Sequence, residues 1–167
     1  MPFDFKTTPE RSRIMASIHK KNTSPELTVR KTLREMGFKG YRIHRKGLPG
    51  TPDIVFISRK KAILIHGCFW HGHACKTGSR RPKSNTEYWI QKIERNKKRD
   101  AANISTLQLL GWEVLTIWEC ELNDRHLLEE RLQVFLRTAS HGAQQDGDGP
   151  KGGVISQCDI GGAPPIP

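Results

Sequence analysis

The chain has 167 residues, with 28 Lys and Arg against 17 Asp and Glu, a formal net charge of +11 and a mean hydropathy of −0.60. This length predicts one domain with a buried core. The sequence contains no apolar run long enough to span a membrane and no apolar signal core near Met1, so we expect a cytoplasmic protein. Residues 6–46 alone carry twelve Lys and Arg, which favours nucleic acid as the partner over a basic surface that serves only solubility.

Capping signals and hydrophobic periodicity predict an alternation of helices and strands. Thr-Pro and Ser-Pro pairs begin the first two helices, and glycines at 37 and 111 end the second and third. The expected elements are helices from Thr8 and from Ser24 to about 36, strands over 41–45, 53–57 and 62–65, a long helix from a cap at Thr86 to about 110, a strand over 112–118, and a helix over about 125–137.

The connections between these elements predict an α/β fold with a central mixed sheet flanked by helices. The strands at 53–57 and 62–65 are joined by a short basic turn and should form a hairpin. The long helix between 62–65 and 112–118 makes a crossover unit, so these two strands should be parallel. We expect the folded domain to comprise residues 1–138, and the Gly- and Pro-rich tail, residues 139–167, to be disordered.

Residues 66–75 hold three histidines and two cysteines directly after the predicted strand at 62–65. If the strand at 112–118 is its parallel neighbour, the cysteine that follows that strand lies at the same edge of the sheet. Three thiolates and one imidazole make a closed, structural zinc site. The expected ligands are Cys68, His73, Cys75 and Cys120. The alternatives are His71 in place of His73, since spacing alone separates them weakly, and ordinary buried cysteines without a metal.

A second set of residues around Asp53 indicates hydrolytic chemistry. A carboxylate at the start of a strand can hold Mg²⁺ against a phosphodiester. Many metal-dependent nucleases place an acidic residue and a lysine on the next strand, but this chain offers Leu64, Ile65 and His66 there. His66 and His71 are then the available groups for proton transfer. The alternatives are a carboxylate that only starts a strand and two structural histidines.

Four segments, residues 49–53, 66–75, 86–93 and 111–120, together resemble the very-short-patch-repair (Vsr) DNA mismatch endonuclease family. The resemblance covers roughly residues 8–137. It implies a restriction-endonuclease-like fold and an enzyme that nicks double-stranded DNA beside a T:G mismatch, the product of 5-methylcytosine deamination. It also implies a nucleoid-associated protein in the cytoplasm of a bacterium that has a cytosine-5 DNA methyltransferase.

The resemblance also implies roles for individual residues. Asp53 matches the magnesium-binding carboxylate, and His71 matches the general base. His66 matches a neighbouring catalytic histidine, and Glu26 an acidic residue near the site. Ile65 departs from the family pattern, in which threonine precedes the first histidine, so we expect it to offer Mg²⁺ only its main-chain carbonyl.

Other positions match the family's zinc ligands and its DNA contacts. The four expected zinc ligands fall on the family's zinc site. Apolar wedges that unstack a base step are physically plausible next to a mismatch. The expected DNA-contacting residues are Met15, Ile18, Phe69 and Trp70 as apolar wedges and Lys20 and Lys21 as phosphate contacts. Phe69 and Trp70 could instead simply pack under the zinc loop.

The leading hypothesis is therefore a monomeric, Mg²⁺-dependent, zinc-stabilised DNA nicking enzyme. One rival is a sequence-specific restriction-type or nicking endonuclease on the same fold. The other is a non-catalytic zinc DNA-binding module. This hypothesis assigns no role to Asp53, His66 or His71.

Overall fold

The computed structural model describes residues 10, 13 and 22–138 of the chain. The predicted tail and the predicted DNA contacts Met15, Ile18, Lys20 and Lys21 lie outside the described residues. The described elements are α2 (Ser24–Glu35), β1 (Arg42–Ile43), β2 (Ile54–Phe56), a 3₁₀ turn (Ile57–Arg59), β3 (Lys61–His66), α3 (Thr86–Leu109), β4 (Glu113–Trp118), a second 3₁₀ turn (Glu119–Asn123) and α4 (Arg125–Arg137).

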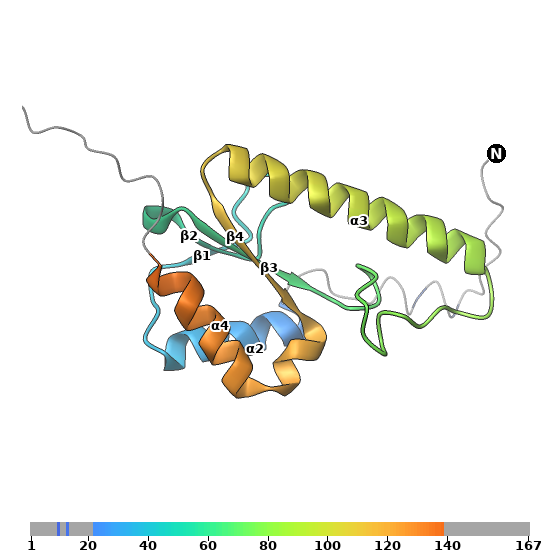
Figure 1. The fold of residues 1–167 in the computed structure, drawn as a ribbon, viewed down its shortest axis with the longest axis horizontal. Helices are drawn as coiled ribbons and strands as arrows, with labels where there is room; N and C mark the ends of the chain where they lie inside the picture. The colour runs from blue at the N-terminus through green and yellow to red at the C-terminus, as the bar shows by residue number, and fades with distance from the viewer. Residues whose placement is uncertain (1–9, 11–12, 14–21, 139–167) are drawn as a thin grey trace, which may run out of the picture.

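The four strands form one mixed sheet in the order β1-β2-β3-β4. β1 pairs antiparallel with β2, and β2 pairs antiparallel with β3, which confirms the predicted hairpin. β3 and β4 are parallel from the pair Lys61–Glu113 to the pair His66–Trp118, as the crossover rule predicted. Helix α3 covers one face of the sheet, and α2 and α4 cover the other (Figure 1).

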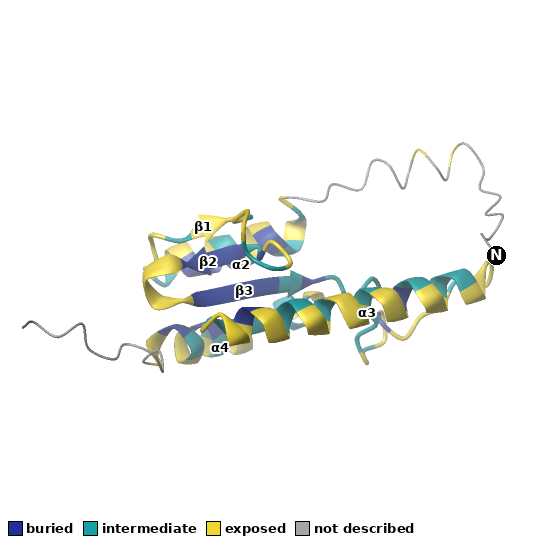
Figure 2. Ribbon diagram, turned by 90° about the horizontal axis from the view of Figure 1, so that it is seen from above, coloured by how far each residue is buried: buried dark blue, intermediate teal, exposed yellow. Residues whose placement is uncertain are grey.

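The main core lies between the sheet and the pair α2 and α4. Alternate residues of the strands, including Ile54, Ile63 and Ile117, pack there against Val29 of α2 and Leu132 of α4. On the opposite face, under α3, the intervening residues Val55, Ala62 and Leu64 of β2 and β3 are buried. Strands β2 and β3 are therefore buried on both sides (Figure 2), which explains why they read as continuous apolar runs.

Helix α3 is longer than the face that it covers, and the first part of the helix extends past the end of the sheet (Figure 1). Ile93 and Leu107 are buried, whereas Ile90 and Leu110, near the two ends of the helix, are about half exposed. The sheet is too narrow to cover both ends of a helix of 24 residues. No helix in the described part of the chain is long and apolar enough to cross a membrane.

Two of the predicted helix caps are shifted by one residue. Thr23, not Ser24, precedes α2, because Glu26 at the third helical position accepts hydrogen bonds from the Thr23 hydroxyl and, more weakly, its amide. Asn85, not Thr86, precedes α3, with φ of 54°, a conformation that asparagine tolerates better than threonine. The carboxylate of Glu26 is thereby held at the start of α2, beside β2.

Lys61 was expected in the basic turn of the hairpin, but it is the first residue of β3 and is buried. Its side chain is 1 % exposed. The Nζ atom donates to Glu113 Oε2 at 3.0 Å, to the carbonyl of Phe135 at 2.6 Å, and to the carbonyl and hydroxyl of Thr138 at 2.8 Å each. Lys61 therefore ties the start of β3 to β4 and caps the C-terminal carbonyls of α4.

We expect Lys61→Met to lower the free energy of unfolding by about 3 kcal/mol, because the α4 carbonyls would stay buried without a donor. Denaturant unfolding monitored by circular dichroism measures this loss. The matched control is Lys31→Met, since Lys31 is exposed and makes only a weak ion pair with Glu35 at 3.9 Å. Equal stability of the two variants would show that the Lys61 contacts contribute little.

A candidate metal-binding loop and a candidate catalytic cleft

The loop that follows β3 and the turn that follows β4 bring four metal-ligating side chains together. One ligand atom from each of Cys68, His73, Cys75 and Cys120 lies within 4.8 Å of the others. The cysteines are free thiols. His73, not His71, joins the cysteines, so the structure separates the two histidines that spacing alone left as alternatives. This arrangement could hold a metal ion.

Main-chain amides and one aromatic ring support this cluster. The Cys120 amide donates to Cys68 Sγ at 3.4 Å, and the Gly78 amide donates to Cys75 Sγ at 3.3 Å. A Cβ atom on Gly78 would lie 2.1 Å from the His73 carbonyl oxygen, so only glycine allows this approach. The His73 ring stacks on Trp118, with centroids 4.3 Å apart, which fixes its orientation.

The thiols of the cluster differ in their acidity. Burial raises the pKa of Cys68 to about 12 and also raises the pKa of Cys120. The hydrogen bond from the Gly78 amide lowers the pKa of Cys75 to about 6. Two of the three thiols thus resist ionisation on their own, and a bound cation is what would let all three act as thiolates.

A cleft of about 820 Å³ lies beside this loop at the same edge of the sheet. It is lined by the N-terminus of α2, the loop before β2, the C-terminal end of β3 and the middle of α3. All four of the predicted catalytic residues line it, together with Ile65 and Trp70. The titratable residues lining the cleft are Glu26, Asp53, His66, His71, Lys92, Arg99, Asp100 and Glu119.

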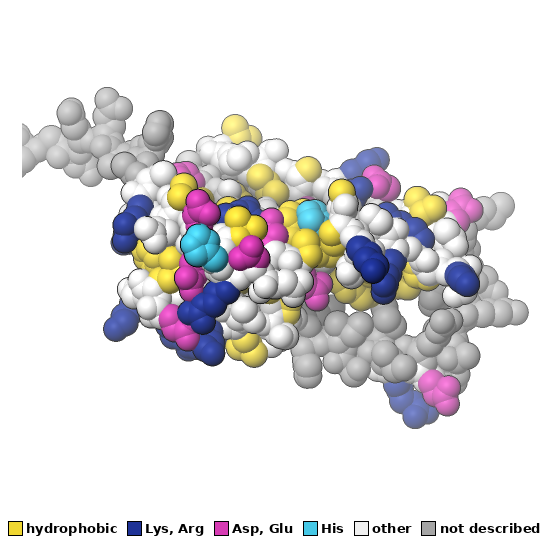
Figure 3. All heavy atoms as spheres, turned by 60° about the horizontal axis from the view of Figure 1, so that its bottom comes forward, with side chains coloured by type: hydrophobic (Ala, Val, Ile, Leu, Met, Phe, Trp, Pro, Cys, Tyr) yellow, Lys and Arg dark blue, Asp and Glu magenta, His cyan; other side chains and the backbone are white. Residues whose placement is uncertain are grey.

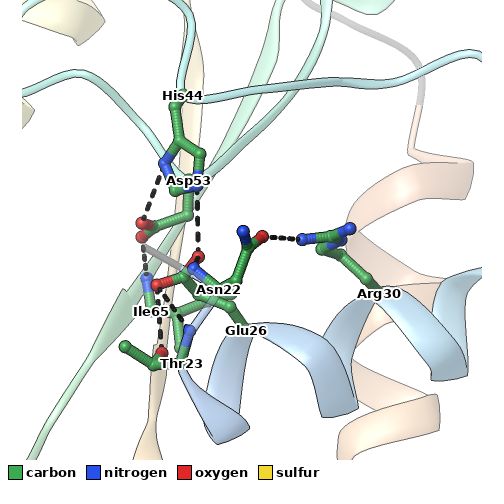
Figure 4. Close-up of polar contacts among 7 residues, drawn as sticks. All are labelled: Asn22, Thr23, Glu26, Arg30, His44, Asp53 and Ile65. Atoms are coloured by element: carbon green, nitrogen blue, oxygen red, sulfur yellow. Dashed lines mark hydrogen bonds and ion pairs between the residues drawn. The ribbon is translucent and has the colours of Figure 1, made fainter. Parts of the chain in front are cut away.

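Asp53 and Glu26 form one polar group in the cleft (Figure 4). Asp53 Oδ2 accepts the Ile65 amide at 2.7 Å, so this carboxylate is held against the end of β3. The main-chain contact from Ile65 is thus its N–H, and the expected role of its carbonyl stays a prediction. Glu26 Oε2 accepts the Asn22 amide at 3.0 Å. His44, which sequence analysis did not select, lies between the two carboxylates (Figure 4).

The position of Asp53 disfavours its charge. Burial raises the pKa of Asp53 to about 6, although the hydrogen bond from the Ile65 amide opposes the rise, and the nearby Glu26 carboxylate adds to it. Keeping Asp53 ionised at neutral pH therefore costs stability unless a cation is present. A group of Asp and Glu oxygens in this state is suited to a divalent cation.

His66 and His71 form the second polar group in the cleft. Their rings are stacked, with centroids 4.0 Å apart and an angle of 6° between the planes. His71 Nδ1 lies 2.5 Å from Asp100 Oδ2 on α3, and Arg99 donates to the other oxygen of Asp100 at 3.2 Å. An Asp100 carboxylate requires a hydrogen on His71 Nδ1, which leaves the lone pair of Nε2 available to take a proton.

The two imidazoles differ in their surroundings. Burial, and then the adjacent His71 ring, lower the pKa of His66 to about 4, while Asp100 partly opposes this. His66 is therefore neutral at physiological pH. The Asp100 carboxylate contacts the His71 ring and fixes its orientation. This difference suits His71 to proton transfer and His66 to hydrogen bonding of an oxygen in the cleft.

An aromatic group lies on the rim of the cleft where the first part of α3 passes the loop. Phe69, Trp70 and Trp89 contact one another edge to face or tilted, with centroids 5.2 to 5.8 Å apart. Lys92 Nζ lies over the rings of Trp70, Tyr88 and Trp89 at 5.2 to 5.5 Å. These rings are half-buried, so they pack together and also present edges to solvent. Lys and Arg side chains are exposed at this end of the molecule, as they are at the opposite end (Figure 3).

Sequence reasoning missed His44 and Asp100. For Asp100 a signal existed, because Asn96, Asp100 and Asn103 follow one another at helical spacing and form a polar stripe on α3. Asn96 donates to the Trp70 carbonyl at 2.9 Å, and Asn103 lines the cleft. For His44 no local pattern existed, since the residue follows a strand of two residues and lies in an irregular segment.

Comparisons with known proteins give a consistent result. The family model described as DNA mismatch endonuclease Vsr matches residues 3–77. The type II nicking enzyme V.XorIIP of Xanthomonas oryzae pv. oryzae is 49% identical over 130 residues, which are 77% of this chain and 94% of that protein. The type II nicking enzyme V.NmeAIP of Neisseria meningitidis is 46% identical over 80% of this chain and 94% of its own. The DNA mismatch endonuclease Vsr of Escherichia coli is 38% identical over 83% of this chain and 91% of its own.

The raised pKa of Asp53 predicts that Asp53→Asn stabilises the protein when Mg²⁺ is absent. The folded-state pKa of about 6 exceeds the ordinary value of 3.8, so the wild type loses stability as pH rises through this window. The lowered pKa of His66 makes stability rise with pH instead. Because His66 is present in both proteins, the difference in stability between the variant and the wild type isolates the contribution of Asp53. We expect the free energy of unfolding of Asp53→Asn to exceed that of the wild type by about 1 to 3 kcal/mol at pH 8, and the difference to vanish near pH 4. Urea unfolding at both pH values measures it, and a loss of stability at pH 8 would contradict the proposed environment of Asp53.

Proposed function

We propose a function from one premise: this chain belongs to the Vsr family of DNA endonucleases. It spans more than nine tenths of the relatives named above, so it has the length for their whole activity. It is a DNA endonuclease, and the reading as a non-catalytic zinc module loses its support. The observation that carries the mechanism is that Asp53, Glu26 and the stacked pair His66 and His71 all line one cleft.

The cluster of Cys68, His73, Cys75 and Cys120 is proposed to hold a structural zinc ion. The donor set of three sulfurs and one imidazole nitrogen is the set that zinc takes in closed structural sites. The two raised thiol pKa values support this proposal, because a divalent cation offsets the cost of ionising buried thiols. The ion would tie the loop after β3 to the end of β4 and so hold His71 in the cleft.

The carboxylates of Asp53 and Glu26 are proposed to hold Mg²⁺ next to the scissile phosphate. When bound, this ion supplies charge that polarises the phosphate and stabilises the leaving oxygen. Asp53 is fixed for this role by the Ile65 amide, and the Ile65 carbonyl is the proposed main-chain ligand. His71, oriented by Asp100, takes the proton of the attacking water at Nε2. Neutral His66 donates or accepts a hydrogen bond at the reacting oxygens.

The proposed target is double-stranded DNA with a T:G mismatch, nicked on one strand. The description of the matching family and the name of the Escherichia coli relative support this target. The aromatic group at the rim supports it as well, because Phe69 and Trp70 present rings that could wedge between bases, and a mismatch lowers the cost of unstacking. Lys92 places a cation among these rings, close to where a phosphate would pass.

A second candidate target is a defined DNA sequence that is fully paired. The names of two relatives, at 49% and 46% identity, describe type II nicking enzymes and mention no mismatch. In either case the proposal includes a restriction-endonuclease-like fold, a monomer in the bacterial cytoplasm near the nucleoid, and a functional link to a cytosine-5 methyltransferase. The charge of +11 supports DNA as the partner.

A nicking assay with a panel of duplexes tests the target. We expect Mg²⁺-dependent nicking of T:G duplexes and no cleavage of the same sequences when fully paired, and we expect Asp53→Ala to bind the T:G duplex without nicking it. Sequencing-gel analysis of end-labelled strands measures nicking, and a native gel-shift assay measures binding. Specific nicking of paired duplexes would favour the second candidate, and undiminished nicking by Asp53→Ala would overturn the assigned metal site.

The proposed zinc site predicts that Cys120→Ser loses zinc and stability together. Three ligands would remain, and the tie between the loop and β4 would be lost. We expect wild type to contain about one zinc per chain, and the variant to contain much less and to unfold at lower temperature. Atomic absorption and calorimetry measure these quantities. Cys158→Ser is the matched control, since Cys158 is not one of the four proposed ligands, and equal zinc contents in the two variants would contradict the ligand assignment.

A further inference from the structure

His44 occupies a strained position that aims its side chain at the carboxylates of the cleft. It directly follows β1, and its φ is 46°, in the left-handed region that residues with side chains rarely adopt. The His44 amide donates to the Asp53 carbonyl at 3.1 Å, which holds this conformation. Backbone strain of this kind costs about 1 to 3 kcal/mol and concentrates at functional sites.

The contacts of the His44 ring are not those of a satisfied structural histidine. Nε2 lies 3.2 Å from Glu26 Oε2, and Nδ1 lies 4.0 Å from Asp53 Oδ1 (Figure 4). Yet Nε2 is buried and makes no hydrogen bond, because the geometry toward Glu26 is not aligned for one. A nitrogen and an oxygen that lie this close, without being aligned for a hydrogen bond to each other, can both bind the same third atom.

The surroundings of this group favour a cation as that third atom. The side chains of His44 and Glu26 are 13% and 6% exposed, so water shields their charges poorly. One ligand atom from each of Glu26, His44 and Asp53 lies within 4.8 Å of the others. The 3.2 Å between His44 Nε2 and Glu26 Oε2 is close to the spacing of about 3 Å between neighbouring ligands in an octahedral shell with bonds of about 2.1 Å.

We propose that His44 is a third side-chain ligand of the catalytic cation, with Glu26 and Asp53, and that its imidazole shifts the preference of this site from Mg²⁺ toward Mn²⁺. Mg²⁺ prefers ligand sets made of oxygen, whereas imidazole nitrogen suits transition ions better. This inference rests on the proposed function, because it concerns the cation that Asp53 is proposed to hold. It adds the residue that sets which ion is bound.

Mn²⁺ binding to the full, zinc-loaded chain tests this proposal without using activity. Electron paramagnetic resonance of free Mn²⁺ gives the affinity, displacement by Mg²⁺ gives the competing affinity, and pulsed measurements detect nitrogen bound to Mn²⁺. We expect nitrogen coupling in the wild type. We expect His44→Gln to lose this coupling and to weaken Mn²⁺ binding about tenfold, with Mg²⁺ binding changed less than about threefold.

Two further variants separate the possible outcomes. His126→Gln, in an exposed position on α4, is the matched histidine control and should behave as wild type. His66→Gln should keep the nitrogen coupling, and its loss there would assign Mn²⁺ to the other imidazole pair and overturn the proposal. Absence of Mn²⁺ binding or of nitrogen coupling in the wild type, or equal losses of Mn²⁺ and Mg²⁺ affinity in His44→Gln, would also overturn it.

Asp53→Asn distinguishes failure of this inference from failure of the proposed function. If Asp53→Asn abolishes Mn²⁺ binding while His44→Gln keeps the nitrogen coupling, Asp53 holds the cation and only the role of His44 is wrong. If Asp53→Asn binds Mn²⁺ as the wild type does, the assignment of the catalytic cation to this group fails, and the role of His44 fails with it. Thermal unfolding of each variant checks that it is folded.

Discussion

The parallel pairing of β3 with β4 is the constraint on which the site depends. The pair His66–Trp118 is the last of six between the two strands, and Cys68 and Cys120 each lie two residues beyond it. The register therefore brings together cysteines that are 52 residues apart, and the Cys120 amide reaches Cys68 Sγ at 3.4 Å. A shift of register would separate the thiols and move His66 and His71 relative to Asp53, so the metal loop and the cleft depend on one set of strand contacts.

The cleft gathers groups that do not favour the folded state by themselves. Asp53 has a raised pKa, and His44 has a strained backbone and a buried nitrogen without a hydrogen bond. The core beneath the sheet and the capping contacts of Lys61 offset these costs. Such local conflict within a consistent fold is typical of sites built for a ligand or a reaction. In this protein the local conflict lies at the carboxylate and imidazole groups of the cleft and not at the aromatic rim. A cation would therefore stabilise the protein most at those groups.

Much of the fold could be predicted because its signals are local. The apolar runs of β2 and β3, the periodicity of α3 and the crossover rule were sufficient to predict the hairpin and the parallel strand pair, and hence the approach of Cys120 to the loop. The remaining features depend on contacts between distant segments. Lys61 looked like part of the basic turn because the carbonyls at the end of α4 that bind it are more than 70 residues away. His44 contacts Glu26 and Asp53, and Asp100 contacts His71, and only the folded chain brings these residues near one another.

The central claim is that the β3–β4 register delivers three thiolates and one imidazole to a single ion. X-ray absorption at the zinc edge of the purified full chain tests it most directly. The predicted spectrum has about three sulfur neighbours at about 2.3 Å and one nitrogen neighbour at about 2.0 Å. A shell made only of nitrogen and oxygen, or a chain that carries no zinc at all after purification without chelators, would contradict the claim.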